Sequence, residues 1–414
     1  MSIPLRALRH RSFSLFIAGQ ACGLIGYWIQ QVALGWLVYR LTGSATLLGV
    51  LSFAANLPVL LLAPLVGLWA DRWNRHRMMI ATQVLEMLQA IALAVLAFTG
   101  LIEIWHIVVL TVFLGMCVAV ELPVRHAYLL ELIGDKQDLP NAVAMMSLVA
   151  NCGRLIGPAL AGLLIGWFGE ATCFLINAIS YVMVLVSFLF IRVNSQTTAA
   201  THAPGLRGLR EGVGYAWRSV PIRLMLALLA VIAFTAAPYS TLMPAIVHEA
   251  FGGSAETLGF LIAAAGLGAV GGTLVLAARG NVRGLMRFIV VAALIAGCAL
   301  IALSLSRLLV LSLALMVAIG FGILVISVAI NMILQAIVDD DKRGRVMSLY
   351  TAAFLGVVPL GGMCAGMLAD RIGATRTVLV GGAVCVLAAL CMARQLPLMR
   401  QHLQPLYARL GIDG

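Results

Sequence analysis

Twelve apolar stretches, each of about 20 residues or more, fill this 414-residue chain almost from end to end. At about 1.5 Å of rise per helical residue, such a stretch crosses a hydrocarbon core about 30 Å thick. The predicted spans are residues 13–39, 46–70, 78–100, 104–124, 141–167, 172–192, 222–246, 256–278, 286–305, 308–334, 346–369 and 375–395. Backbone polar groups in lipid must be satisfied within helices or closed barrels, so the pattern predicts an all-α integral membrane protein.

The composition excludes a soluble globular protein. Apolar residues make up 62% of the chain, charged residues make up 10%, and the mean hydropathy is +1.06. A soluble domain carries about 25% charged residues. The net charge of +11 would suit a nucleic-acid partner, but its distribution follows the connections between spans instead.

Arginine and lysine collect in alternate connections. Of the 27 basic residues, four lie in odd-numbered connections and one, Arg154, lies inside a span. The four are Arg40, Arg307, Arg371 and Arg376. Basic residues mark the cytoplasmic side, so we predict that both termini are cytoplasmic and expect no nucleic-acid partner.

Cysteine and histidine give no sign of a metal, a cofactor or an enzyme. The eight cysteines lie in apolar segments without CxxC spacing, and the seven histidines are scattered. Isolated membrane cysteines behave as small hydrophobic residues. The sequence has no phosphate-binding loop and no nucleophile–base pattern, which argues against an ATP-driven pump and an integral-membrane enzyme. The first apolar run is longer than that of a signal peptide, so we expect it to be retained.

The two halves of the chain repeat each other. Residues 129–148 and 333–349 both run from a polar connection into Met-Ser-Leu, at an offset of about 203 residues. The same shift carries Gly162 onto Gly366. Matches in the same order, half a chain apart, predict a duplicated six-helix unit.

The repeat divides the chain into two predicted bundles. We assign residues 1–192 to an N-terminal six-helix bundle and residues 222–414 to a C-terminal one with a short cytoplasmic tail. Residues 193–221 form the predicted cytoplasmic linker. Pseudo-symmetric bundles of this kind are typical of rocking transporters, whose site lies at the midplane between the halves.

Two motifs resemble those of the major facilitator superfamily. Residues 67–77 read Gly-Leu-Trp-Ala-Asp-Arg-Trp-Asn-Arg-His-Arg, which resembles the signature after the second helix of these transporters. Residues 151–162 read Asn-Cys-Gly-Arg-Leu-Ile-Gly-Pro-Ala-Leu-Ala-Gly, which resembles the fifth-helix motif of the exporter branches. With Leu-Pro-Asn-Ala at 139–142, the chain is similar to the bacterial subgroup that contains the enterobactin exporter and macrolide efflux proteins.

The resemblance implies a cytoplasmic gate at the first motif. Asp71 lies at the C-terminal end of a helix, where the helix dipole is unfavourable for a negative charge. In the superfamily the matching aspartate bonds the start of helix 11 and an arginine of helix 4, here Arg125, and so latches the outward-facing state. The motif residues are Gly67, Asp71, Arg72, Arg75 and Arg77. The alternative is that these charges only set the topology.

Three ionisable groups inside spans are candidates for a proton or charge relay. Glu121 and Arg125 lie four apart on one helix face, where they can form an ion pair that is structural or that switches with protonation. Glu86 is the acid deepest in a span, and its alternative role is structural. Arg154 must meet Glu121, Asn151, carbonyl groups or an anionic substrate, or else tether neighbouring helix ends.

The fifth-helix motif predicts close helix packing. Gly157 and Pro158 introduce a kink, and Gly162 lets another helix approach. We expect a complementary surface on helix 8. The glycines of that surface are Gly266, Gly268, Gly271 and Gly272. In the resembling family this contact, which includes the position of Asn151, marks exporters; the alternative is packing alone.

Helix 1 carries two stripes at helical spacing. Gly19, Gly23, Gly26 and Gln30 predict a close-packing face. The other candidates are large polar side chains that suit a cavity, although such groups more often bond neighbouring helices. These residues are Gln20, Tyr27, Gln31, Asn56, Tyr239, Asn331 and Gln335. A mostly apolar lining favours an amphipathic or lipophilic solute.

The expected function is secondary active export of an amphipathic small molecule (a drug, a siderophore or a similar metabolite). We expect a monomer that works by alternating access in the bacterial inner membrane and is driven by the proton gradient. Two alternatives with the same fold stay open, a lysophospholipid or other lipid flippase and an uptake facilitator.

Overall fold

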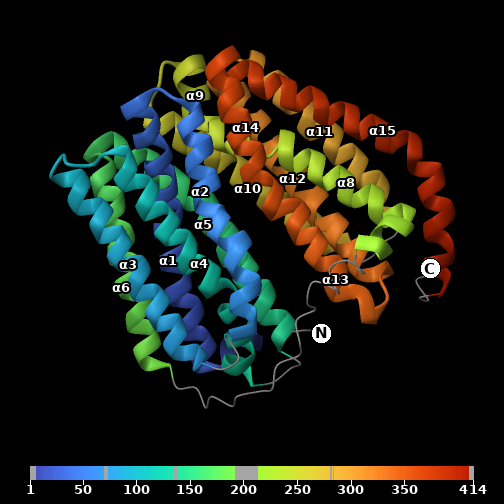
Figure 1. Ribbon diagram of the computed structural model, residues 1–414, viewed down its shortest axis with the longest axis horizontal. Helices are drawn as coiled ribbons and strands as arrows, with labels where there is room; N and C mark the ends of the chain where they lie inside the picture. Colours follow the sequence, from blue (N-terminus) through green and yellow to red (C-terminus); the bar gives the residue numbers. More distant parts are fainter. Residues whose placement is uncertain are drawn as a thin grey trace. The chain divides into compact units, whose positions relative to one another are not determined.

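The structure is a computed structural model of the chain and describes residues 6–69, 73–134, 138–191, 213–279, 282 and 284–409. These residues form helices and their connections, and none of them lies in a strand (Figure 1). Twelve helical segments in this part of the chain are long and apolar enough to cross a membrane. The predicted all-α membrane fold with twelve spans is therefore confirmed.

The helices group into two compact units. Unit 1 comprises Met1–Gly43, Ala54–Ala203 and Ser254–Ala263, and unit 2 comprises Ser44–Phe53, Pro204–Gly253 and Ala264–Gly414. The helices of unit 1 are η1 (Arg6–Arg9), α1 (Arg11–Thr42), α3 (Arg75–Phe98), α4 (Ile104–Ile133), α5 (Leu139–Phe168) and α6 (Glu170–Phe190). Those of unit 2 are α8 (Val220–Thr235), α9 (Tyr239–Phe251), α11 (Leu285–Leu305), α12 (Leu309–Ile337), α13 (Asp340–Thr351), the π-helical η3 (Ala352–Gly356), α14 (Val357–Ile372) and α15 (Ala374–Arg409). The division at residues 192 and 222 stays a prediction.

Two helices begin in one unit and continue in the other. The first turns of α2 (Ala45–Trp69) belong to unit 2, and the first turns of α10 (Ala255–Arg279) belong to unit 1. A side chain on Gly162 of α5 would meet the α10 backbone, with Ala255 O only 2.8 Å from its Cβ. A side chain on Gly366 of α14 would likewise overlap Ala45 O of α2. The two glycines matched by the internal repeat therefore make the same kind of contact in the two units.

A carboxylate holds the start of α2. Asp370 accepts hydrogen bonds from the backbone N–H of Ala45 (2.7 Å) and of Thr46 (3.0 Å) and from the Ser44 hydroxyl (2.7 Å). The first backbone N–H groups of a helix have no partner within it, and a negative charge there is favourable. Asp370 therefore fixes the entry of α2 into unit 2.

The predicted partner surface of the fifth-helix motif is wrong in detail. Gly259 is the α10 glycine that meets this motif, since its Cβ would overlap Pro158 O and the Gly162 backbone. Gly268 instead lies against the α12 backbone at Val317. Gly157 faces α1, where its Cβ would come within 2.5 Å of the Trp28 side chain. The sequence predicted the correct helix, but not that only its residues up to Ala263 belong to unit 1.

The glycine stripe of α1 packs on α6. The Cβ positions of Gly19 and Gly26 are filled by Ser187 and Ser180, and that of Gly23 lies 2.8 Å from Val184. Small residues let helix backbones approach closely where no hydrophobic effect drives them together.

Gln30 ends this stripe in a buried amide chain. Its Nε2 donates to Gln89 Oε1 of α3 over 3.1 Å, and Asn177 Nδ2 of α6 donates to its Oε1 over 2.9 Å. Hydrogen-bonded amides of this kind satisfy polar groups that lipid and apolar neighbours cannot. The chain therefore ties α1, α3 and α6 together.

The seventh span is broken, unlike the continuous helix predicted for residues 222–246. α8 ends at Thr235 and α9 begins at Tyr239, because Pro238 has no N–H with which to continue the helix. The carbonyl oxygens of Phe234 and Thr235 instead lie against Gly361 of α14 and Gly381 of α15. Both glycines leave room for oxygen atoms that have lost their helical donors.

We predict opposite effects of one added methyl group at two helical glycines. A Cβ at Gly26 would lie 2.7 Å from Asn177 Oδ1, so Gly26→Ala should lower the free energy of unfolding by about 1–3 kcal/mol. A Cβ at Gly271 would have no neighbour within 4 Å, so Gly271→Ala should be neutral or add up to about 1 kcal/mol through helix propensity. Thermal unfolding in detergent measures both, and equal midpoints would contradict the packing of α1.

Candidate functional site

A buried cluster of ionisable side chains lies among the helices of unit 1. Glu86 of α3 and Glu121 of α4 are each 3% exposed. Arg125 Nη2 lies 2.5 Å from Glu121 Oε1, one helical turn along α4, and the arginine side chain is 21% exposed. The four-residue spacing on α4 thus produces an ion pair whose carboxylate is buried and whose cation is partly open.

Gln83 joins the second carboxyl group to this ion pair. Its Nε2 donates to Glu121 Oε1 over 3.0 Å and lies 3.4 Å from Glu86 Oε2. Glu86 also interacts with Tyr181 of α6 and with Glu121 directly. One amide nitrogen therefore touches both carboxyl groups, and five side chains, with Arg125 and Tyr181 included, form one network.

Several buried polar atoms around the network have no hydrogen-bond partner among the described residues. They are Gln20 Nε2, Glu86 Oε1, Gln89 Nε2, Thr111 Oγ1 and Arg125 Nε. More than nine in ten buried polar groups in proteins are hydrogen-bonded, so each exception needs an explanation. A concentration of such atoms on α1, α3 and α4 is typical of a place that takes up water, protons or a ligand.

Four of the predicted cavity residues lie on α1 and α2. Tyr27 is partly buried, interacts with Gln31 and lies close enough to Glu86 to feel its charge. Gln20 is buried at 4% exposure. Asn56 of α2 is partly buried and belongs to the same unit. All four therefore lie in unit 1, and Tyr27 is the one tied electrostatically to the carboxyl cluster.

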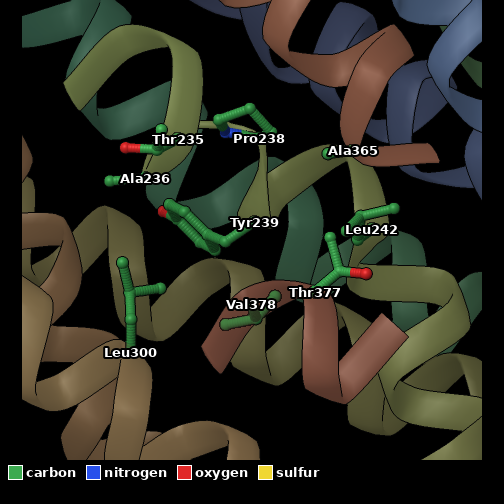
Figure 2. Close-up of a pocket in the computed structure, with 9 residues that line it drawn as sticks. All are labelled: Thr235, Ala236, Pro238, Tyr239, Leu242, Leu300, Ala365, Thr377 and Val378. Carbon is green, nitrogen blue, oxygen red and sulfur yellow. The ribbon is translucent and has the colours of Figure 1, made fainter. Parts of the chain in front are cut away.

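The other predicted cavity residues lie in unit 2. Gln335 Nε2 donates to Asn331 Oδ1 of the same helix over 2.5 Å. Tyr239, which is 6% exposed, lines a small pocket beside the α8–α9 break (Figure 2). The pocket also includes Thr235, Ala236, Pro238, Leu242, Leu300, Ala365, Thr377 and Val378. Apart from the hydroxyls of Thr235, Tyr239 and Thr377, its side chains are apolar.

The contact of Arg154 differs from each of those expected. Its guanidinium lies 5.6 Å from the centroid of the Trp28 ring of α1. Asn151 donates within its own helix, to Ser147 O over 2.9 Å. This face of α5 lies toward α1, where a cation–π interaction with Trp28 stabilises the charge. The predicted roles of Arg154, as a partner of Glu121, Asn151, carbonyl groups or an anionic substrate or as a tether between helix ends, stay predictions.

The first motif is described only in part. Asp71 and Arg72 lie outside the described residues, and Gly67 lies in α2. Arg75 Nη1 pairs with Glu131 Oε1 over 2.8 Å, with both side chains 11% exposed. Arg77 is exposed, and its backbone N–H donates to the Asn74 cap of α3. The predicted bond between Asp71 and Arg125 stays a prediction.

Sequence reasoning missed Gln83 and Tyr181. A signal for Gln83 was present, since Thr82, Gln83, Glu86 and Gln89 recur at helical spacing and are all buried on α3. No signal in the sequence singled out Tyr181. Its position depends on how α6 packs against α3.

The chain is similar to known transport proteins over most of its length. A family model described as transmembrane secretion effector matches residues 2–408. The staphyloferrin A transporter of Staphylococcus aureus is 27% identical, over 87% of this chain and 91% of that protein. Macrolide efflux protein A of Streptococcus pyogenes is 23% identical, over 93% of this chain and 95% of that protein.

The fold also matches a solved structure. A bacterial homolog of the human lysosomal transporter Spinster, in an inward-facing and unoccupied conformation, aligns with a TM-score of 0.74. The alignment covers 96% of this chain and 98% of that one at 16% identity. At this identity the likeness shows the fold alone.

We predict that removing one partner of the buried ion pair destabilises the protein more than removing both. Arg125→Met leaves Glu121 buried without its cation and should lower the free energy of unfolding by about 3–5 kcal/mol. The double variant Arg125→Met/Glu121→Leu should recover most of this loss, as measured by thermal unfolding in detergent.

The matched control is the exposed pair of Arg40 and Glu170, in which the arginine side chain is 54% exposed. Arg40→Met should cost at most about 1 kcal/mol. If the double variant is less stable than Arg125→Met alone, Glu121 and Arg125 are not coupled as described.

Proposed function

The chain belongs to the transmembrane secretion effector family of the major facilitator superfamily, and from this premise we propose that it is a proton-coupled exporter of an amphipathic small molecule. It is a multi-pass membrane transporter and not an enzyme. We place it in the bacterial inner membrane. Both termini would be cytoplasmic, because the basic residues collect in the termini and in the even-numbered connections.

One observation carries the proton coupling. Glu86, Glu121 and Arg125 are ionisable groups on membrane-spanning helices; the two carboxyl groups are buried, and Glu121 contacts both Glu86 and Arg125. Ionisable groups at membrane depth are costly and most often mark ion or proton pathways. A charge that appears or disappears in such a cluster changes the relative stability of two conformations, which is what coupling requires.

The substrate class follows from two further points. One relative is named as a staphyloferrin A transporter and another as a macrolide efflux protein, and this chain aligns with 91% and 95% of their lengths. The polar candidates on α12 and α1 are neutral amides and hydroxyls. A solute with a large apolar surface and several neutral hydrogen-bonding groups fits such a lining.

The gate is proposed from the first motif. Asp71 would bond the start of helix 11 and Arg125 in the state that is closed to the cytoplasm. Arg125 then has two alternative carboxylate partners, Asp71 and the Glu121 to which it is bonded here. Exchange between the two links the charge of the cluster to the gate.

Accumulation in inverted vesicles tests the proposal. An exporter moves solute into the lumen, so an acid lumen should drive uptake of a macrolide or of staphyloferrin A. Glu121→Gln should lower this uptake by about tenfold or more, because it removes the charge from a buried charge-assisted hydrogen bond. Glu170→Gln, at the exposed ion pair, should keep wild-type uptake.

Two outcomes would contradict the proposal. Uptake that is the same with and without the pH gradient would exclude proton coupling. Movement of labelled lysophospholipid with no uptake of either solute would favour the lipid flippase.

A further inference from the structure

We infer that Glu86, and not Glu121, carries the transported proton, and that Gln83 is the positioning residue that connects Glu86 to the Glu121–Arg125 ion pair. The inference rests on the proton coupling proposed above and deepens it. It assigns different tasks to two acids that the sequence could not tell apart.

The two acids differ in their partners. Glu121 Oε1 accepts from both Arg125 Nη2 (2.5 Å) and Gln83 Nε2 (3.0 Å), so its negative charge is met by a cation and a dipole. Within the described residues Glu86 makes no ion pair. Its donors are the same Gln83 nitrogen, at 3.4 Å, and the Tyr181 hydroxyl, and its Oε1 is buried without a hydrogen-bond partner.

Titratable and charged groups face Glu86 from each of the neighbouring helices. α4 contributes Glu121, Arg125 and Cys117, α6 contributes Tyr181, and α1 contributes Tyr27. Arg125 is the one cation among them, and it is already bonded to Glu121.

The balance of charge in the cluster places the proton on Glu86. With Glu121 ionised and Arg125 charged, the cluster is neutral only if Glu86 is a carboxylic acid. A hydrogen bond between two carboxyl groups also requires that one of them is protonated. Glu86 is the group that would otherwise be a buried charge without a counterion.

Release of this proton changes the charge of the cluster. When Glu86 releases its proton to water as H⁺, the cluster changes from neutral to a single negative charge. Arg125 is then attracted by two carboxylates, and the Gln83 amide, which already touches both, can turn its donor fully toward Glu86. Deprotonation of Glu86 thus weakens the hold of Glu121 on Arg125, which is the side chain that the gate needs.

The decisive variant is Glu86→Gln, which has nearly the shape of the neutral acid and cannot release a proton. In proteoliposomes, exchange of labelled for unlabelled solute needs no net proton movement, so it should stay near the wild-type rate. Accumulation driven by the pH gradient should disappear. The probe is whichever of the macrolide and staphyloferrin A the wild type accumulates.

The outcomes separate this inference from the function on which it rests. If the wild type accumulates neither solute in response to the gradient, the proposed function fails. If the wild type responds and Glu86→Gln also accumulates, Glu86 does not carry the proton and only this inference fails.

The role of Gln83 is tested by the pH profile of accumulation driven by the pH gradient. Gln83→Met removes the donor that favours the ionised form of Glu86, so the half-maximal pH should rise by about one unit. Gln89→Met is the matched control, because Gln89 is equally buried on α3 but bonds Gln30 instead. An unshifted profile for Gln83→Met, or the same shift for Gln89→Met, would overturn the positioning role.

Discussion

The structure depends on one constraint, namely that a charge within an apolar helix bundle must be met by another charge or by a donor. Arg125 and Glu121 satisfy it with a direct ion pair between groups one turn apart on α4. Glu86 satisfies it only in part, through neutral donors, namely an amide that it shares with Glu121 and the Tyr181 hydroxyl. Glu121 has a cationic partner and Glu86 has none, and this difference is the physical reason why a mobile proton would reside on Glu86.

The surrounding packing holds this network at fixed geometry. α1 lies against α6 along a stripe of glycines, and a chain of three buried amides ties both helices to α3. α2 and α10 each begin in one compact unit and continue in the other, and glycines of α14 and α5 contact their first turns. Close backbone approach thus holds the helices where no hydrophobic effect between them is available.

Local periodicity determined what the sequence could predict. The twelve spans, the shared face of Glu121 and Arg125 and the glycine stripe of α1 all follow from spacing within one helix. Three features depend on how the helices rotate and pack against one another, and they could not be predicted from the periodicity of a single sequence. They are the contact of Arg154 with Trp28, the Gln83 bridge and the residue at which α10 passes from one unit to the other. The break before Tyr239 was predictable in principle, because Pro238 stands inside an otherwise continuous apolar run.

Infrared spectroscopy of the purified protein in an ester-free detergent tests the central claim most directly. At neutral pH the wild type should show the carbonyl stretch of a protonated carboxylic acid. This band should be absent from Glu86→Gln and retained in Glu170→Gln, whose substitution lies outside the cluster. A band that survives in Glu86→Gln would show that the buried proton resides on another group and would contradict the account.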